Sequence, residues 1–137
     1  QERNEKVFVL LGDGELYEGS VWEAVMFAGE HNLDNLIVII DNNKICMLDY
    51  CRNILDLEPL GEKFKVFKWE VERVDGHQVD KLHTSLKRLK AKNNGKPKLL
   101  IADTIKGKGV RRLETDPLCH IKNLSPEEVD AIIPELE

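Results

Sequence analysis

The sequence predicts an α/β fold in which a parallel β-sheet is flanked by helices. Four short runs typical of strands are separated by segments long enough for helices, and these runs cover residues 7–11, 36–40, 69–74 and 98–103. Parallel neighbours need long crossover connections, which are usually helical and right-handed. The alternation of strand and helix along the chain therefore favours a parallel sheet.

The first helix is expected between the first two strands. Ser20 and Glu23 fit a capping box in which Ser20 is the N-cap and the Glu23 side chain reaches back to the backbone. Apolar residues recur at helical spacing from Val21 to Ala28. We expect this helix to end near His31.

Three further helices are expected in the rest of the chain. A loop ends at Pro59, before a short helix at residues 61–66. Residues 79–89 carry apolar side chains at helical spacing, which predicts a second long helix. A last short helix should begin after Ser125, because Ser125 and Glu128 fit a second capping box.

Length and composition describe a single domain with a core. The 137 residues are 42% hydrophobic and 33% charged, and the net charge of −5 argues against a general nucleic-acid binder. No apolar stretch is long enough to span a membrane, and the polar first residues do not form a secretory signal. Cys46, Cys51 and Cys119 lack metal-ligand spacing, so we expect free thiols and a cytoplasmic location.

Two polar motifs follow the first two expected strands. Gly12-Asp13-Gly14 comes directly after the first strand, and Asn42-Asn43 follows the second. The carboxyl ends of parallel strands share one sheet edge, where open α/β folds bind ligands. Asp13 and Asn43 should therefore face each other and offer oxygen ligands to a hard cation, which usually accompanies a phosphate. Either motif alone more often marks a plain turn, and the GxGxxG and GxxxxGK[ST] nucleotide motifs do not occur.

The two motifs and their surroundings resemble a known family. Their spacing is similar to the thiamine-diphosphate signature, and residues 12–43 look like transketolase, especially the separate amino-terminal subunit of split transketolases. Residues 104–110, TIKGKGV, resemble the TxKGKG segment of that family. The similarity covers nearly the whole chain and is weakest over residues 46–60. It implies the thiamine-diphosphate-binding fold, with residues 1–137 forming the second half of a diphosphate-binding domain whose amino-terminal half is absent.

The resemblance also implies a metal and cofactor site. Asp13, Asn43 and the main-chain carbonyl of Ile45 would hold Mg²⁺ (or Ca²⁺), with two phosphate oxygens and a water completing an octahedron. Gly12 and Gly14 lack a Cβ, so their backbone can approach the diphosphate and adopt unusual dihedral angles.

The charged residues Glu15, Glu18 and Lys106 near the motifs can be interpreted in two ways. By resemblance, Glu15 and Lys106 contact the cofactor, and Glu18 lies in the catalytic region at the contact with the partner subunit, near the pyrimidine. Without a ligand, the two glutamates would be exposed acids that stabilise a helix start, and Lys106 would be a solvated loop lysine.

Two histidines are candidates for function. His120 follows the TIKGKG segment and resembles the family histidine that faces the reacting centre, where a neutral imidazole can move a proton. The residue after it, Ile121, departs from the family pattern. His77, in Asp75-Gly76-His77, more often acts as a structural hydrogen-bonding residue at a strand end.

The resemblance implies a transferase that moves a two-carbon ketol unit between sugar phosphates, with thiamine diphosphate supplying the difficult chemistry. It implies a partner, the pyrimidine-binding or carboxy-terminal transketolase section, in a homo- or hetero-oligomer, and a chain inactive alone. Alternatives are a component of a deoxyxylulose-phosphate synthase or 2-oxoacid dehydrogenase, a non-catalytic thiamine- or metal-binding module, and a fold fragment without a ligand. The sequence leaves the donor and acceptor sugars open.

Overall fold

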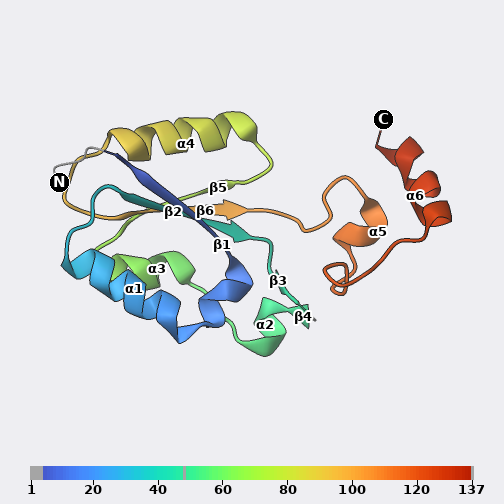
Figure 1. The fold of residues 1–137 in the computed structure, drawn as a ribbon, viewed down its shortest axis with the longest axis horizontal. Helices are drawn as coiled ribbons and strands as arrows, with labels where there is room; N and C mark the ends of the chain where they lie inside the picture. Colours follow the sequence, from blue (N-terminus) through green and yellow to red (C-terminus); the bar gives the residue numbers. More distant parts are fainter. Residues whose placement is uncertain (1–4, 48, 137) are drawn as a thin grey trace.

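The computed structural model describes residues 5–47 and 49–136, and its centre is a four-stranded sheet (Figure 1). The strands are β1 (Val7–Gly12), β2 (Leu36–Asn42), β5 (Glu70–Asp75) and β6 (Lys98–Asp103). They lie in the order β1-β2-β6-β5, and all neighbouring pairs are parallel. The predicted parallel α/β fold is confirmed, and all four predicted strands are present.

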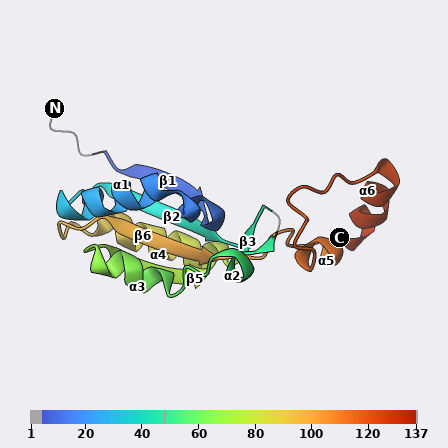
Figure 2. The same cartoon turned by 90° about the horizontal axis from the view of Figure 1, so that it is seen from below.

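Helices cover the two faces of the sheet unequally. On one face lie α1 (Gly19–Glu30) and α3 (Leu60–Val66), and on the other lies α4 (Val79–Ala91) (Figures 1 and 2). The main core lies between α1, α3 and the sheet. The helix α4 packs against β5 and β6. Strand β1 forms one edge, where Phe8 and Leu10 remain 49% and 69% exposed.

An aromatic cluster joins α1 and α3 to the sheet. The fully buried Phe64 ring lies 5.5 Å from the Trp22 ring and 5.3 Å from the Trp69 ring, between ring centroids. The Trp69 indole N–H donates to the Val25 carbonyl at 2.9 Å, so this buried polar group is satisfied. Phe64 therefore connects the two helices of this layer through close ring contacts.

Truncating Phe64 should destabilise the fold strongly. Phe64→Ala removes a buried ring between two tryptophans, and we expect the free energy of unfolding to fall by about 3–5 kcal/mol. Chemical denaturation of the chain measures this, with Val66→Ala as a control on the same helix, because Val66 is 77% exposed. Equal losses in the two variants would contradict the placement of the core.

The start of the first helix differs from the prediction. The residue before α1 is Glu18, not Ser20, and its side chain makes no capping hydrogen bond. A 3₁₀ turn, η1 (Asp13–Tyr17), comes between β1 and α1 and leaves Glu18 in an extended conformation. The Val21 amide then donates to the Glu18 carbonyl at 3.1 Å, so the helix starts earlier than predicted. The capping box predicted for Ser20 and Glu23 is wrong.

The second capping box is confirmed. Ser125 precedes α6 (Pro126–Ile132), its hydroxyl accepts from the Glu128 amide at 3.3 Å, and the Glu128 carboxylate accepts from the Ser125 amide at 2.8 Å. A short 3₁₀ turn, η2 (Ile133–Glu135), follows. With α5 (Arg111–Glu114), these elements lie to one side of the sheet in both views (Figures 1 and 2).

The segment predicted as a loop after β2 contains short regular elements. Strands β3 (Ile45–Cys46) and β4 (Asp49–Tyr50) pair antiparallel, and α2 (Cys51–Ile54) follows.

None of the helices in the described part of the chain is long and apolar enough to cross a membrane.

Candidate functional site

The structure brings all the predicted site residues into the lining of one cavity. This cavity has a volume of about 530 Å³ and lies beyond the carboxyl ends of β1 and β2. The nine predicted residues in its lining are Gly12, Asp13, Gly14, Glu15, Glu18, Asn43, Ile45, Lys106 and His120. Sequence reasoning did not single out four other lining residues, which are Tyr17, Cys46, Met47 and Ile54.

Asp13 is a buried carboxylate at the centre of this site. Its side chain is held where β1 passes into η1, and the residue is only 6% exposed. Burial is the largest effect and raises the pKa of Asp13, while hydrogen bonds from the Lys44 and Gly14 amides oppose it in part. The nearby Asp41 charge raises the pKa further, and Lys106 lowers it by a smaller amount. The Lys44 amide donates to the Asp13 carboxylate at 2.5 Å. An ionised Asp13 is therefore incompletely compensated, and a bound cation would relieve this cost.

Asn43 begins a tight turn beside Asp13. Its side-chain oxygen accepts from the Ile45 amide at 3.1 Å, and its amide group donates to Asp41 at 3.4 Å. Lys44 adopts a left-handed conformation, with φ of 68°. This turn brings Asp13, Asn43 and Ile45 together, which are the three predicted metal ligands.

The two glycines beside Asp13 have ordinary backbone angles. Gly12 is extended, with φ −79° and ψ 157°, and neither Gly12 nor Gly14 is among the residues with positive φ. The expected unusual dihedral angles are therefore wrong for this pair. Packing instead favours glycine at position 14, because a Cβ there would lie 3.2 Å from the Cys46 Cβ, a tight contact that would require Cys46 to shift slightly. The positive-φ glycines near the site are Gly107 and Gly109, in the loop after β6.

The two predicted glutamates are placed differently. The Glu15 carboxylate accepts from the Gly12 amide at 2.6 Å, so this backbone donor is already occupied. Glu18 is exposed at the junction of η1 and α1. Both residues line the cavity, but only the Glu15 carboxylate is hydrogen-bonded to the Gly12 amide.

Lys106 and His120 contact each other in the lining of the cavity. The Lys106 ammonium lies 3.2 Å from Nδ1 of His120. An ammonium only donates hydrogen bonds, so Nδ1 must accept and the neutral ring carries its proton on Nε2. This contact leaves the Nε2–H group of His120 as a donor.

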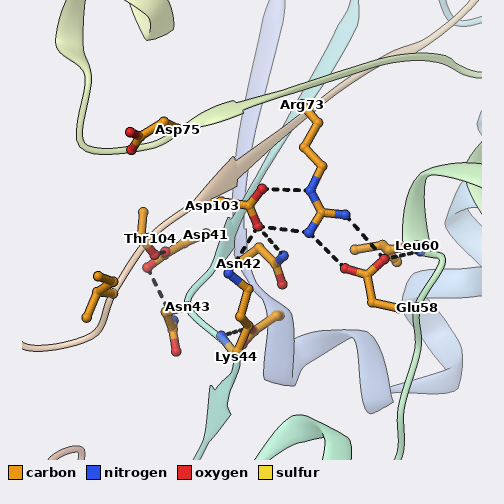
Figure 3. A network of polar contacts seen from close by, with 12 residues as sticks. Asp41, Asn42, Asn43, Lys44, Glu58, Leu60, Arg73, Asp75, Asp103 and Thr104 are labelled. Atoms are coloured by element: carbon orange, nitrogen blue, oxygen red, sulfur yellow. Dashed lines mark hydrogen bonds and ion pairs between the residues drawn. The ribbon is translucent and has the colours of Figure 1, made fainter. Parts of the chain in front are cut away.

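A polar network behind the site was not predicted from the sequence. Asp103, at the end of β6, accepts from Arg73 at 2.7 and 2.8 Å and from Asn42 at 2.8 Å, and it forms an ion pair with Lys44 at 3.3 Å (Figure 3). Hydrogen bonds from Arg73 are the main cause that lowers the pKa of Asp103 to about 2. Arg73 also binds Glu58 at 2.9 Å, so the network ties the ends of three strands to the loop before α3.

This network should make stability depend on pH in acid. Asp103 has a depressed pKa, so its contribution is present above the unfolded value of 3.8 and is lost as pH falls through about 2. Asp103 is 31% exposed, so we expect a loss of only about 1 kcal/mol. The free energy of unfolding of Asp103→Asn, measured between pH 5 and about 2, should fall less steeply than that of the parent. Glu62→Gln, at an exposed pair, is the control, and parallel curves for parent and Asp103→Asn would refute the assignment.

A second cavity of about 500 Å³ adjoins the first. The two share Asp13, Tyr17, Asn43, Ile45 and Lys106 in their lining. Residues of the segment 50–58 form the outer wall of the second cavity. The expected metal ligands therefore lie between two hollows at the same sheet edge.

Comparisons with known proteins identify the family of the chain. Residues 2–136 match the family described as transketolase, thiamine diphosphate binding domain. The chain is 40% identical to the 6-deoxy-6-sulfo-D-fructose transketolase subunit of Clostridium sp. (strain MSTE9) over 131 residues, covering 96% of this chain and 47% of that protein. It is 39% identical to one subunit of the apulose-4-phosphate transketolase of Actinobacillus succinogenes, with the same coverage.

The fold also matches solved structures. The transketolase of Campylobacter jejuni superposes with a TM-score of 0.77 and 34% identity, covering 84% of this chain and 18% of that one. The chain thus spans about half the length of the two subunit relatives and a smaller share of this transketolase. Because the family match, the relatives and the fold all agree, the chain belongs to the thiamine diphosphate-binding domain family of the transketolases.

Proposed function

We propose that this chain is the thiamine-diphosphate- and Mg²⁺-binding component of a transketolase that moves a two-carbon ketol unit between sugar phosphates. The observation that carries the proposal is the convergence of nine expected residues on one cavity around the buried Asp13 carboxylate. A fold fragment without a ligand has no need for an incompletely compensated carboxylate at the open edge of its sheet.

The donor atoms at this edge fit a hard cation that is shared with a diphosphate. Within residues 5–47 and 49–136, no three His, Cys, Asp or Glu side chains are grouped to hold a metal. Asp13, Asn43 and the Ile45 carbonyl would supply one carboxylate, one amide and one main-chain oxygen. Mg²⁺ is commonly bound by one or two carboxylates together with substrate phosphates and water, so phosphate oxygens would complete its shell.

The residues around the metal position would bind and orient the reactants. Thiamine diphosphate, when bound, supplies the carbon centre that carries the two-carbon unit. Lys106 places a positive charge on the same cavity lining as Asp13, where it favours a diphosphate or a sugar phosphate. His120 would donate its Nε2–H to a substrate oxygen as negative charge develops there and would later recover that proton. Lys106 keeps His120 in the tautomer that this step requires.

The proposal includes a partner that supplies the pyrimidine-binding section. Two relatives are named as transketolase subunits, and the chain covers 47% of each. The exposed Phe8 and Leu10 on the β1 edge give a further section of the same domain an apolar surface on which to pack. We therefore expect a homo- or hetero-oligomer, and the free thiols of Cys46, Cys51 and Cys119 support a reducing cytoplasm as its location.

A reconstitution experiment tests this function. The purified chain alone should show no ketol transfer between sugar phosphates at any concentration of thiamine diphosphate and Mg²⁺. Adding a carboxy-terminal transketolase section, together with any missing part of this domain, should give activity. Turnover by the isolated chain would refute the need for a partner, and a reconstituted assembly that neither binds the cofactor nor turns over would refute the proposed function.

A further inference from the structure

The Asp75-Gly76-His77 turn follows β5 and packs against the residues that follow β6. The Gly76 amide donates to the Asp103 carbonyl at 2.7 Å. A Cβ on Gly76 would lie 2.5 Å from the Thr104 side chain and 3.0 Å from the Asp103 carbonyl. Because no side chain fits in this space, glycine lets the turn approach the base of the neighbouring loop.

The turn holds the His77 side chain in a defined place. The His77 amide donates to one Asp75 carboxylate oxygen at 3.0 Å, and the Gln78 side chain donates to the other at 2.8 Å. The Ile105 amide donates to Nε2 of His77 at 2.8 Å. A backbone amide is only a donor, so Nε2 is unprotonated and the neutral ring carries its proton on Nδ1.

The amides of Thr104 and Ile105 anchor the start of the loop at residues 104–110, which follows β6. The Thr104 amide donates to the Asn42 carbonyl at 3.2 Å, which ties the loop to β2. The Ile105 amide is tied to His77 after β5. The next residue is Lys106, whose side chain reaches the cavity and contacts His120. The His77 contact therefore fixes the backbone immediately before Lys106.

We propose that His77 is a positioning residue: its neutral imidazole anchors the Ile105 amide and so holds Lys106 in place toward the cavity and His120. The anchoring is a property of the chain itself. Its effect on cofactor binding rests on the proposed function, in which Lys106 attracts the diphosphate.

The anchor depends on the protonation of His77. A proton on Nε2 turns the acceptor into a donor, and the ring can then no longer bind the Ile105 amide. Asp75 from the same turn and Glu114 from α5 are the acidic groups that act on His77. Glu114 itself binds the Gly109 amide at 2.9 Å and the Lys108 ammonium at 3.4 Å. Acid should therefore release the loop and leave a protonated His77 drawn toward these carboxylates.

Hydrogen exchange at the Ile105 amide tests the anchor directly. In His77→Ala the amide loses its acceptor, and its protection should fall by roughly threefold to tenfold. His77→Gln places an uncharged oxygen near the position of Nε2 and should restore most of the protection. His83→Ala, at an exposed histidine on α4, is the matched control and should leave the Ile105 amide unchanged.

The pH profile separates this role from simple packing. Protection of the Ile105 amide, corrected for the intrinsic exchange rate, should fall in the parent as the solution is acidified from neutral pH, because a protonated imidazole no longer accepts from the amide. In His77→Gln it should not vary with pH. Unchanged protection in His77→Ala, failure of His77→Gln to restore it, or a flat profile in the parent would each overturn the proposal.

Cofactor titration completes the test. Mg²⁺-dependent binding of thiamine diphosphate to the assembled protein should weaken in His77→Ala by about the factor lost in protection, and His77→Gln should recover it. Lost protection with unchanged binding would overturn the link between the anchor and the cofactor site. A parent protein that does not bind thiamine diphosphate would refute the proposed function instead, while the exchange data would still decide whether His77 anchors the loop.

Discussion

Asp13→Asn should greatly weaken Mg²⁺-dependent binding of thiamine diphosphate while leaving the fold intact. The substitution keeps the shape of the side chain and an oxygen that can accept from the Lys44 amide. It removes the only carboxylate among the three proposed metal ligands. The protein then has no negative side chain to hold Mg²⁺, and the diphosphate loses the cation that neutralises its charge. Loss of one partner of a buried charge pair corresponds to a decrease in affinity of about 30-fold to more than 1,000-fold.

The same substitution should have the opposite effect on the ligand-free protein. Burial raises the pKa of Asp13, so its ionised form opposes folding at neutral pH and the fold gains stability as pH falls toward the raised pKa. Asp13→Asn removes this cost, and the free energy of unfolding at pH 7 should rise. A residue kept at the expense of stability is typical of a binding site.

Calorimetric titration and chemical denaturation of the same preparations measure both effects. Asp80→Asn, at an exposed position in the first turn of α4, is the control; it should leave cofactor affinity unchanged and slightly lower stability, because it removes a favourable charge at the helix start. Cofactor affinity in Asp13→Asn equal to that of the parent would exclude Asp13 as a ligand. A less stable ligand-free variant would show that Asp13 serves the fold instead.

Local sequence signals predicted the strands of the fold well. The runs at residues 7–11 and 36–40 are apolar and short, and they became β1 and β2. The segment 98–103 was predicted with the same bounds as β6, which is buried along nearly its whole length. The runs of β2 and β6 are apolar because parallel strands inside a sheet are covered on both faces. Strand β1 is an edge strand, and part of its apolar run remains exposed.

The start of α1 was harder to predict because two signals competed. Ser20 and Glu23 fit a capping box, but the 3₁₀ turn after Asp13 set the direction in which the chain entered α1. The Glu15 carboxylate accepts from the Gly12 amide across this turn, a contact that lies outside the helix itself. At Ser125 no preceding turn interfered, and the same kind of capping box formed.

The position of the site followed from topology, and its supporting contacts did not. Asp13 and Asn43 each follow a strand, so parallel pairing of β1 with β2 was enough to bring them to one edge. Arg73 and Asp103 are 30 residues apart and meet because β5 pairs with β6. No local pattern marks such a pair, although polar residues at the ends of neighbouring strands are a usable signal. The assignment of metal and cofactor contacts stays a prediction.

His120→Ala in the assembled enzyme should lower kcat much more than it raises KM. His120 lies on the cavity lining, and its contact with Lys106 leaves Nε2–H free to donate to a reacting oxygen. Losing a proton-transfer group costs about 10²–10⁴-fold in rate. Cofactor affinity should change far less, because the proposed metal ligands lie on other elements.

The alternative is that His120 only packs in a surface loop. His120 is exposed, and its neighbours form turns, with the Cys119 amide donating to Asp116 and the Ile121 amide to Leu118 at 3.1 Å each. A purely structural histidine there would give a mild change in stability and nearly normal turnover. Steady-state kinetics of His120→Ala and of the His83→Ala control distinguish the two roles. A kcat within about threefold of the parent would remove His120 from the site, because that change is far smaller than the loss expected for a proton donor.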